Sequence, residues 1–230
     1  MQHQYRSTGS AGFTLIELLV ALAVMALMTT MGWQALAGMQ SAMEGNRSHN
    51  DAVLTTEAGL NQWTADLDAM QEIPQTRSLD WDGRALRLTR RSAQQGDGAY
   101  VVAWTRAERA ERAVWLRWQS GPVSTRESWQ AAWGAAAAWA QGAQASTVNA
   151  LAGNASSIRP AEVSITALSA WQLFYYRGGA WSNPLSSAGA QNAAALPDGI
   201  RLVLTLDAPH PLAGTIVRDW ARPTLLGATP

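Results

Sequence analysis

The chain has 230 residues, no cysteine, and 17 basic residues against 17 acidic ones. This length accommodates one anchor helix and one globular domain of ordinary size. The lack of cysteine excludes disulfides, thiol catalysis and zinc–cysteine sites, and the zero net charge argues against nucleic acid as a partner.

The first predicted element is a membrane-spanning helix. Residues 18–43 include no charged side chain, and about 20 apolar residues are enough to cross a bilayer. One carboxylate, Glu17, stands at the start of this run, in the sequence Gly12-Phe-Thr-Leu-Ile-Glu17. A charge inside a membrane segment costs roughly 2.5–3.5 kcal/mol on insertion scales, so we expect Glu17 to have a function and a partner.

This hexapeptide and the apolar run behind it resemble the class III signal of type IV prepilins and type II secretion pseudopilins. The resemblance implies that a prepilin peptidase cleaves between Gly12 and Phe13 and N-methylates Phe13, so that residues 1–12 form a leader peptide. It also implies that Glu17 pairs with the N-terminal amine of a neighbouring subunit. Because a close pair offsets much of the cost of two buried charges, Glu17 is expected to be an assembly residue.

Two other interpretations of the N-terminus remain open. In an ordinary secretory signal peptide, Arg6 would be the basic region, Leu18–Met28 the apolar region, and Ala35-Leu-Ala37 the cleavage site before Gly38. A plain transmembrane anchor is the other. Neither explains Glu17. The positive-inside rule, applied to Arg6, places residues 1–12 in the cytoplasm.

The helix is predicted to continue from Phe13 to about Ile73, where Pro74 ends it. Beyond the membrane, apolar residues recur at helical spacing and polar residues occupy the other face. The apolar stripe is Val53, Leu60, Trp63, Leu67 and Met70, and the polar face carries Glu57, Asn61 and Asp68. This stripe is expected to pack on the chain's own sheet, with a neighbouring subunit as the alternative.

The rest of the chain is predicted to form short antiparallel strands, which gives an α+β fold with a long N-terminal helix packed on a sheet, as in pilins. Residues 13–43 are assigned to the transmembrane and assembly helix and residues 44–230 to a periplasmic domain. The charged run 106–112 is interpreted as a solvated connection. The predicted strands are Ala85–Arg90, Tyr100–Trp104, Val114–Trp118, Val163–Leu168, Leu173–Arg177, Ile200–Leu206 and Ile216–Trp220.

Residues 128–158 carry no charge. We predict a short helix around Glu127–Gln141 and then a loop to about Ser157. Tryptophan is enriched at binding hot spots, so Trp129, Trp133 and Trp139 are candidates for an interface. Tryptophans within strand patterns are expected in the core; these are Trp104, Trp115, Trp118 and Trp171.

No catalytic, metal-binding or cofactor-binding pattern is found in the sequence, so the protein is not expected to be an enzyme. The three histidines, His3, His49 and His210, are scattered, and no dinucleotide, P-loop or hydrolase motif occurs. Asp80-Trp-Asp-Gly83 faintly suggests a calcium loop, but position 12 of an EF-hand would be Arg91 instead of glutamate. A tight turn is predicted there.

Four further segments resemble the J-type minor pseudopilin of type II secretion. They are Trp63–Leu67, Trp171–Arg177 followed by Trp181, Leu196–Thr205, and Gly214–Trp220. The resemblance implies a single-pass inner-membrane subunit at the tip of the pseudopilus, with a periplasmic domain. Its implied partners are the I-, K- and H-type minor pseudopilins, the major pseudopilin and the prepilin peptidase. A minor type IV pilin and a membrane-anchored glycan-binding protein are the alternatives.

Overall fold

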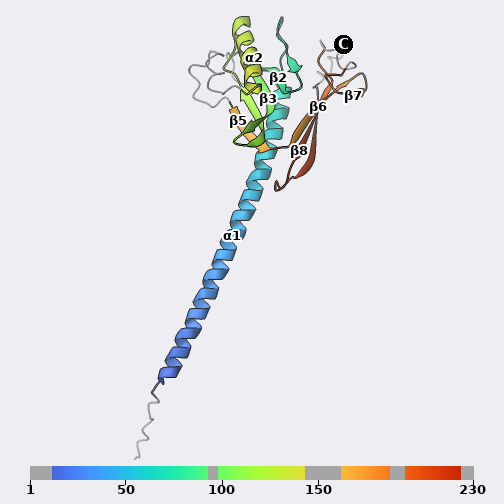
Figure 1. Ribbon diagram of the computed structural model, residues 1–230. Coiled ribbons are helices and arrows are strands. Elements are labelled where there is room, and N and C mark those ends of the chain that lie inside the picture. The colour runs from blue at the N-terminus through green and yellow to red at the C-terminus, as the bar shows by residue number, and fades with distance from the viewer. Residues whose placement is uncertain (1–11, 93–97, 143–161, 187–194, 224–230) are drawn as a thin grey trace, which may run out of the picture. The chain divides into compact units, whose positions relative to one another are not determined.

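The computed structural model describes residues 12–92, 98–142, 162–186 and 195–223 (Figure 1). The chain divides into two compact units, Met1–His49 and Asn50–Pro230, which we call the N-terminal and C-terminal units and describe separately. The predicted boundary between the assembly helix and the periplasmic domain follows residue 43 because Glu44 is the next charged residue. This boundary stays a prediction.

Helix α1 runs from Leu15 to Asp68 without a proline. Its predicted end near Ile73 is wrong, because the chain leaves the helix to pair with a strand before it reaches Pro74. Met70 forms an isolated β-bridge with Arg90, and the Gln71 N–H donates to the Thr89 carbonyl at 2.9 Å. Sheet hydrogen bonds therefore end this helix earlier than proline would.

The described part of the C-terminal unit contains two antiparallel sheets and a second helix, α2 (Arg126–Ala140). The first sheet has the order β1-β2-β3-β4-β5 and the second has the order β7-β6-β8-β9. The strands are β1 (Leu79–Trp81), β2 (Ala85–Arg91), β3 (Ala99–Arg109), β4 (Arg112–Gln119), β5 (Glu162–Ala167), β6 (Ala170–Arg177), β7 (Ala180–Ser182), β8 (Gly199–Leu206) and β9 (Gly214–Ala221).

The predicted α+β class, the seven predicted strands and the predicted short helix are confirmed. The sequence did not indicate that the strands divide into two sheets. It also missed β1 and β7, which are three residues long and too short to show alternation. The loop predicted after α2 lies largely in residues 143–161, outside the described residues.

The charged run 106–112 is a β-hairpin, which corrects its interpretation as a solvated connection. Strands β3 and β4 pair as far as Arg109 opposite Arg112. The two residues between them, Ala110 and Glu111, have φ angles of 48° and 65°. Two positive φ angles are what a two-residue type I′ turn needs to match the twist of its strands. The sequence pattern did not indicate these strand ends, because their charged side chains are exposed or half-buried and show no apolar alternation.

The first sheet is covered on both faces (Figure 1). One face packs on α2 through small residues such as Ala85, Val101 and Ala103. The other face meets α1 and the second sheet in a larger cluster that includes Trp104 and Trp115. Residues adjacent along β3 point to opposite faces, so one strand contributes to both clusters.

Within the C-terminal unit, α1 buries the apolar stripe expected from its sequence. Leu60, Trp63 and Leu67 are buried in the cluster shared with both sheets. Val53 and Met70 are half-buried, and the polar residues Glu57, Asn61 and Asp68 are exposed. The chain's own sheets therefore cover this face, as predicted.

At Gly59, α1 lies close to Ile165 of β5. A Cβ atom on Gly59 would lie 2.4 Å from Ile165 Cγ2 and 3.3 Å from Trp115 Cζ3. Alanine favours a helix over glycine by about 1 kcal/mol, but overpacking a core typically costs about 1–3 kcal/mol. We expect Gly59→Ala to lower the free energy of unfolding, measured in urea on the full chain in detergent.

Gly134→Ala is the matched control. Gly134 lies inside α2, and a Cβ atom there would meet nothing within 4 Å. This substitution is expected to stabilise the chain by about 0.5–1 kcal/mol through helix propensity alone. Equal effects at the two glycines would contradict the close approach at Gly59.

Candidate functional site

The first turn of α1 is closed by Thr14 and Glu17, the third residue of the helix. The Glu17 N–H donates to Thr14 Oγ1 at 3.3 Å, while the Thr14 N–H and hydroxyl donate to Glu17 Oε2 at 3.3 and 3.2 Å. These reciprocal bonds form a capping box, which satisfies backbone N–H groups that have no partner inside the helix. The carboxylate also lies at the positive end of the helix dipole.

The sequence analysis missed this second role of Glu17. The pattern Thr-x-x-Glu immediately before an apolar run is a recognisable signature of a helix start. It is present at residues 14–17. Glu17 therefore has a partner in its own chain, Thr14, in addition to the partner expected for it in an assembly.

The predicted cleavage site lies just ahead of the capping box. Gly12 and Phe13 precede the helix, both are exposed, and the Phe13 side chain is 87% exposed. Exposed, non-helical segments are the usual sites of proteolysis. Cleavage here would leave the new amine on Phe13, next to the Thr14 N–H that already donates to Glu17. Cleavage and methylation themselves stay predictions.

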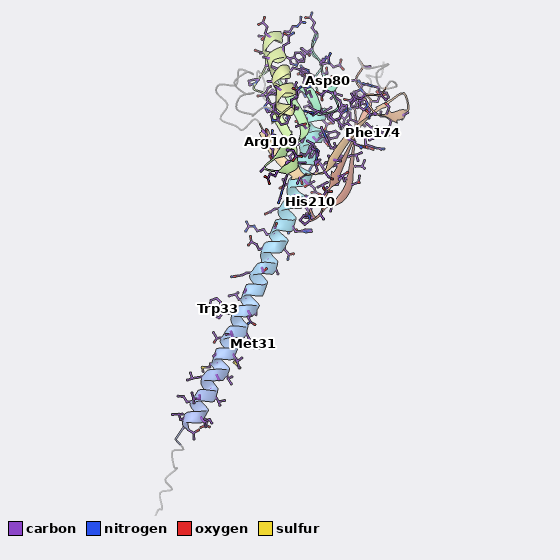
Figure 2. All side chains as sticks on the ribbon, viewed as in Figure 1. Met31, Trp33, Asp80, Arg109, Phe174 and His210 are labelled. Atoms are coloured by element: carbon purple, nitrogen blue, oxygen red, sulfur yellow. The ribbon has the colours of Figure 1, made fainter. Side chains whose placement is uncertain are left out.

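Behind this turn, α1 presents an apolar surface that no part of the N-terminal unit covers among the described residues. An 18-residue window has a mean hydropathy of 2.1, and none of it is buried. Figure 2 shows Met31 and Trp33 projecting from the helix. At 1.5 Å per residue, the uncharged segment 18–43 is about 39 Å long, against roughly 30 Å for the hydrocarbon core of a bilayer. This helix is long and apolar enough for single-pass membrane anchoring.

A second cluster of charges surrounds Asp66, which is fully buried near the end of α1. Arg117 donates to its two oxygens from Nε at 2.7 Å and Nη2 at 2.9 Å. Arg90 Nη1 donates at 2.9 Å, Trp104 Nε1 at 3.0 Å and Gln62 Nε2 at 2.8 Å. One carboxylate thus joins the helix to strands β2, β3 and β4. We interpret the Asp66 cluster as the anchor of α1 in its sheet.

The sequence analysis assigned Asp66 no role of its own. A carboxylate between Trp63 and Leu67 in the apolar stripe was the available signal, because such a position places it on the buried face. Its partners could not be identified, since Arg90, Trp104 and Arg117 are 24, 38 and 51 residues away.

The structure corrects the expected surface role of two tryptophans in α2. Trp129 and Trp139 are 7% and 0% exposed and belong to the core between α2 and the first sheet. Trp129 Nε1 donates to Thr89 Oγ1 at 2.9 Å. Trp133 is half-buried and stacks on Trp129 with ring centroids 4.9 Å apart. The apolar face of α2 is therefore explained by its packing on the first sheet.

Trp139 donates to a half-buried charge pair, Arg109 and Glu162. Its Nε1 donates to Glu162 Oε2 at 2.6 Å, and Arg109 donates to both Glu162 oxygens at 2.9 and 3.0 Å. Burial opposes ionisation of this carboxyl, but the hydrogen bonds from Arg109 and Trp139 outweigh burial and hold the pKa of Glu162 below its usual range. This contact fixes β5 to α2 and the β3 hairpin.

The other sequence-based assignments are largely confirmed. Trp104, Trp115 and Trp118 are fully buried, whereas Trp171 is half-buried. Asp82 closes a tight turn, as predicted. Its Oδ1 accepts from the backbone N–H of Arg84 at 2.9 Å and of Ala85 at 2.8 Å, and Gly83 has φ = 89°.

Comparison with known protein families finds a match between residues 8–33 and the model described as the prokaryotic N-terminal methylation motif. The matched residues include the Gly12–Phe13 bond, the capping box and residues 18–33 of the apolar segment. No curated protein matches the chain.

Proposed function

We propose that this chain, which carries at residues 8–33 the N-terminal methylation motif of type IV pilin-like and pseudopilin precursors, is a J-type minor pseudopilin of a type II secretion system. The observation that carries the proposal is the arrangement of its N-terminus. An accessible Gly12–Phe13 bond, a carboxylate at Glu17 and an uncovered apolar helix follow one another within one segment.

In this proposal the chain is first anchored in the inner membrane and then withdrawn into a filament. Residues 18–43 would exchange contacts with lipid for contacts with neighbouring helices, so the same apolar surface serves both states. The amine on Phe13 of one subunit would pair with Glu17 of the next. The domain from about residue 44 onward lies in the periplasm. The protein performs no reaction of its own and needs no cofactor.

The assignment to the J type is supported by the segments that resemble it, since these coincide with structural elements. Trp63–Leu67 contains the buried Asp66, and Trp171–Arg177 is nearly all of strand β6. The proposed partners are the I-, K- and H-type minor pseudopilins at the filament tip, with the major pseudopilin below them. The prepilin peptidase acts on the chain before assembly.

A minor type IV pilin is the second candidate, because the same methylation motif supports it. The two functions differ in the process that depends on the chain, which is protein export for a pseudopilin and pilus formation for a minor pilin. A strain that lacks this chain should lose export of proteins across the outer membrane and keep its surface pili if the chain is a pseudopilin. Loss of pili with normal export would identify a minor pilin.

The prepilin pathway itself is tested at the mature N-terminus. We expect mass spectrometry of the chain from native membranes to show N-methylated Phe13 as the first residue. Gly12→Ala is expected to leave the precursor uncleaved, because a side chain at the residue before the cleaved bond would obstruct the peptidase.

Gly38→Ala is the matched control, since a Cβ atom at either glycine meets nothing within 4 Å in the structure. It should be processed normally. A mature chain that begins at Gly38 would contradict the proposal and identify an ordinary secreted protein.

A further inference from the structure

One edge of the second sheet is open. Strand β9 ends the order β7-β6-β8-β9, so it pairs with β8 on one side and with no strand of the described chain on the other. This pairing is regular over eight residues, with no bulge and no proline in the strand. Proteins usually shorten, bulge or cover such an edge, because it is a template for another strand. The edge of β9 is therefore a candidate surface for strand addition.

The other sheet edges within the described chain are less suitable for this role. Strands β1 and β7 are only three residues long. Strand β5 has six residues, and its pairing with β4 includes a register shift. Short strands and irregular pairing are two of the devices that keep an edge from accepting a further strand. These devices are missing at β9.

The backbone groups on the open side of β9 follow from its pairing with β8. The Arg222 N–H donates to the Asp198 carbonyl at 2.8 Å. Hydrogen-bonded and non-hydrogen-bonded pairs alternate along an antiparallel ladder, so the even-numbered residues of β9 bond to β8. The odd-numbered residues direct their N–H and C=O groups away from it, and all of them are exposed. They are Thr215, Val217, Asp219 and Ala221.

One side chain gives this edge a positive charge without a carboxylate partner. Arg218 is half-buried, and its Nη2 donates to Asn61 Oδ1 of α1 at 3.1 Å. An amide accepts a hydrogen bond but does not neutralise a guanidinium, which has five N–H donors. The adjacent Asp219 is paired with Arg201, whose Nε and Nη2 donate to it at 2.7 and 2.6 Å. No ion pair between described residues includes Arg218.

The charge of Arg218 determines which strand fits the edge. Because Arg218 bonds to β8, it would take a non-hydrogen-bonded position against an added antiparallel strand, where facing side chains come closest. An acidic residue at that position would pair with Arg218. Its neighbours on the same face of the added strand would lie opposite Ile216 and Trp220, which favours apolar side chains there.

A second copy of β9 cannot supply the acidic residue. In an antiparallel pair of β9 edges, the outward-bonding residues of one copy face those of the other, so Arg218 would face an even-numbered residue. None of the even-numbered residues is acidic. They are Gly214, Ile216, Arg218 and Trp220. The partner is therefore expected to have a different sequence.

We propose that the open edge of β9 binds an extended segment of another protein that carries an acidic residue between apolar ones. The segment adds as an antiparallel strand. Its backbone bonds to Val217 and Asp219, and its carboxylate pairs with Arg218. This inference goes beyond the proposed assembly function, which is carried by the N-terminal residues of the chain.

The test uses the full chain in lipid nanodiscs and a fluorescein-labelled peptide, with empty nanodiscs as the blank. The peptide, Thr-Val-Thr-Glu-Thr-Val-Thr, favours an extended conformation and has glutamate on one face between two valines. Two analogues replace glutamate with glutamine or lysine. Fluorescence anisotropy should show the glutamate peptide binding about tenfold more tightly than the lysine peptide, with glutamine between them, because facing opposite charges stabilise a strand pair and like charges destabilise it.

Hydrogen exchange locates the bound peptide on the chain. Exchange of the Val217 and Asp219 amides should slow in the complex, because their N–H groups gain partners on the added strand. The amides of Arg218 and Trp220 already bond to β8 and should change little. Mass spectrometry with residue-level fragmentation measures both sets.

Val217→Pro tests the backbone contribution. Proline removes the outward N–H of residue 217 and is tolerated on an edge strand whose N–H faces solvent. Binding of the glutamate peptide should fall about tenfold through the lost hydrogen bond. Val217→Thr is the matched control, because threonine keeps the N–H and the branched β-carbon. It should bind as the unmodified chain does.

Arg218→Glu tests the charge. The variant should bind the lysine peptide more tightly than the glutamate peptide, which reverses the order found with the unmodified chain. An unfolded variant would show no preference, so a reversed preference cannot result from unfolding. This variant also decides the question if Val217→Pro fails to fold.

The proposal is overturned if the glutamate peptide does not bind, if the three peptides bind equally, or if Arg218→Glu does not reverse the preference. Unchanged binding in a folded Val217→Pro variant would also overturn it. Dimers of the chain that Val217→Pro abolishes would show that a second copy occupies the edge instead. None of these outcomes depends on cleavage after Gly12 or on filament assembly, so the proposed function is tested separately.

Discussion

Replacing Asp66 with alanine is expected to destabilise the C-terminal unit by about 3–5 kcal/mol, the cost of removing one partner from a buried charge pair. The substitution leaves the guanidinium groups of Arg90 and Arg117 facing each other without their anion. Their side chains are only 22% and 12% exposed, so water compensates them poorly. Because domains are stable by only about 5–15 kcal/mol, this loss is a large share of the total. Urea unfolding followed by tryptophan fluorescence measures it.

Asp68→Ala is the matched control, two residues further along the same helix. Asp68 is exposed and accepts one hydrogen bond, from Trp220 Nε1 at 2.8 Å. Its loss should cost about 0.5–1.5 kcal/mol, the usual contribution of a hydrogen bond. If the two alanine variants unfold at the same urea concentration, the Asp66 cluster does not anchor the helix.

The second large effect is expected at Glu17, where one side chain caps its own helix and, in the proposed function, pairs with a neighbour. Glu17→Gln separates the two roles. Glutamine also serves at this position of a capping box, so the helix should still begin at Leu15. The charge is lost, and we expect the amount of chain recovered in sheared filaments to fall at least tenfold. Mass spectrometry should still find a mature chain that begins at Phe13.

Thr14→Ala gives the reciprocal variant. It removes the capping hydroxyl, which typically costs about 0.5–2 kcal/mol of helix stability, and it keeps the carboxylate of Glu17. Assembly should persist, with a helix start that is less protected in amide exchange. Normal assembly of Glu17→Gln together with failed assembly of Thr14→Ala would show that the cap matters and the charge does not.

The features that could be predicted are those that depend on residues close together in the sequence. The cleavage junction, the apolar segment and Glu17 are contiguous, so their chemistry could be proposed without a fold. Strands such as β8 were found because buried and half-buried side chains alternate along them. The same local logic could have identified the capping box at Thr14 and Glu17.

The features that escaped prediction depend on residues far apart in the chain. Trp139 was expected at an interface because tryptophan is enriched at binding hot spots, but its partner Glu162 comes 23 residues later, in strand β5. Hydrophobic pattern predicts which faces are buried, and it does not specify what they are buried against.

The position of Asp66 also sets an order of events during synthesis. The carboxylate is made before every partner except Gln62, and Arg117 follows it by 51 residues. At translation rates of about 5–20 residues per second, this interval is about 3–10 s. Trp220, which bonds to Asp68, comes 152 residues after it and so arrives about 8–30 s later. The first sheet can therefore close on the helix while the second is still unmade, so the C-terminal unit can be built around α1 in two successive stages.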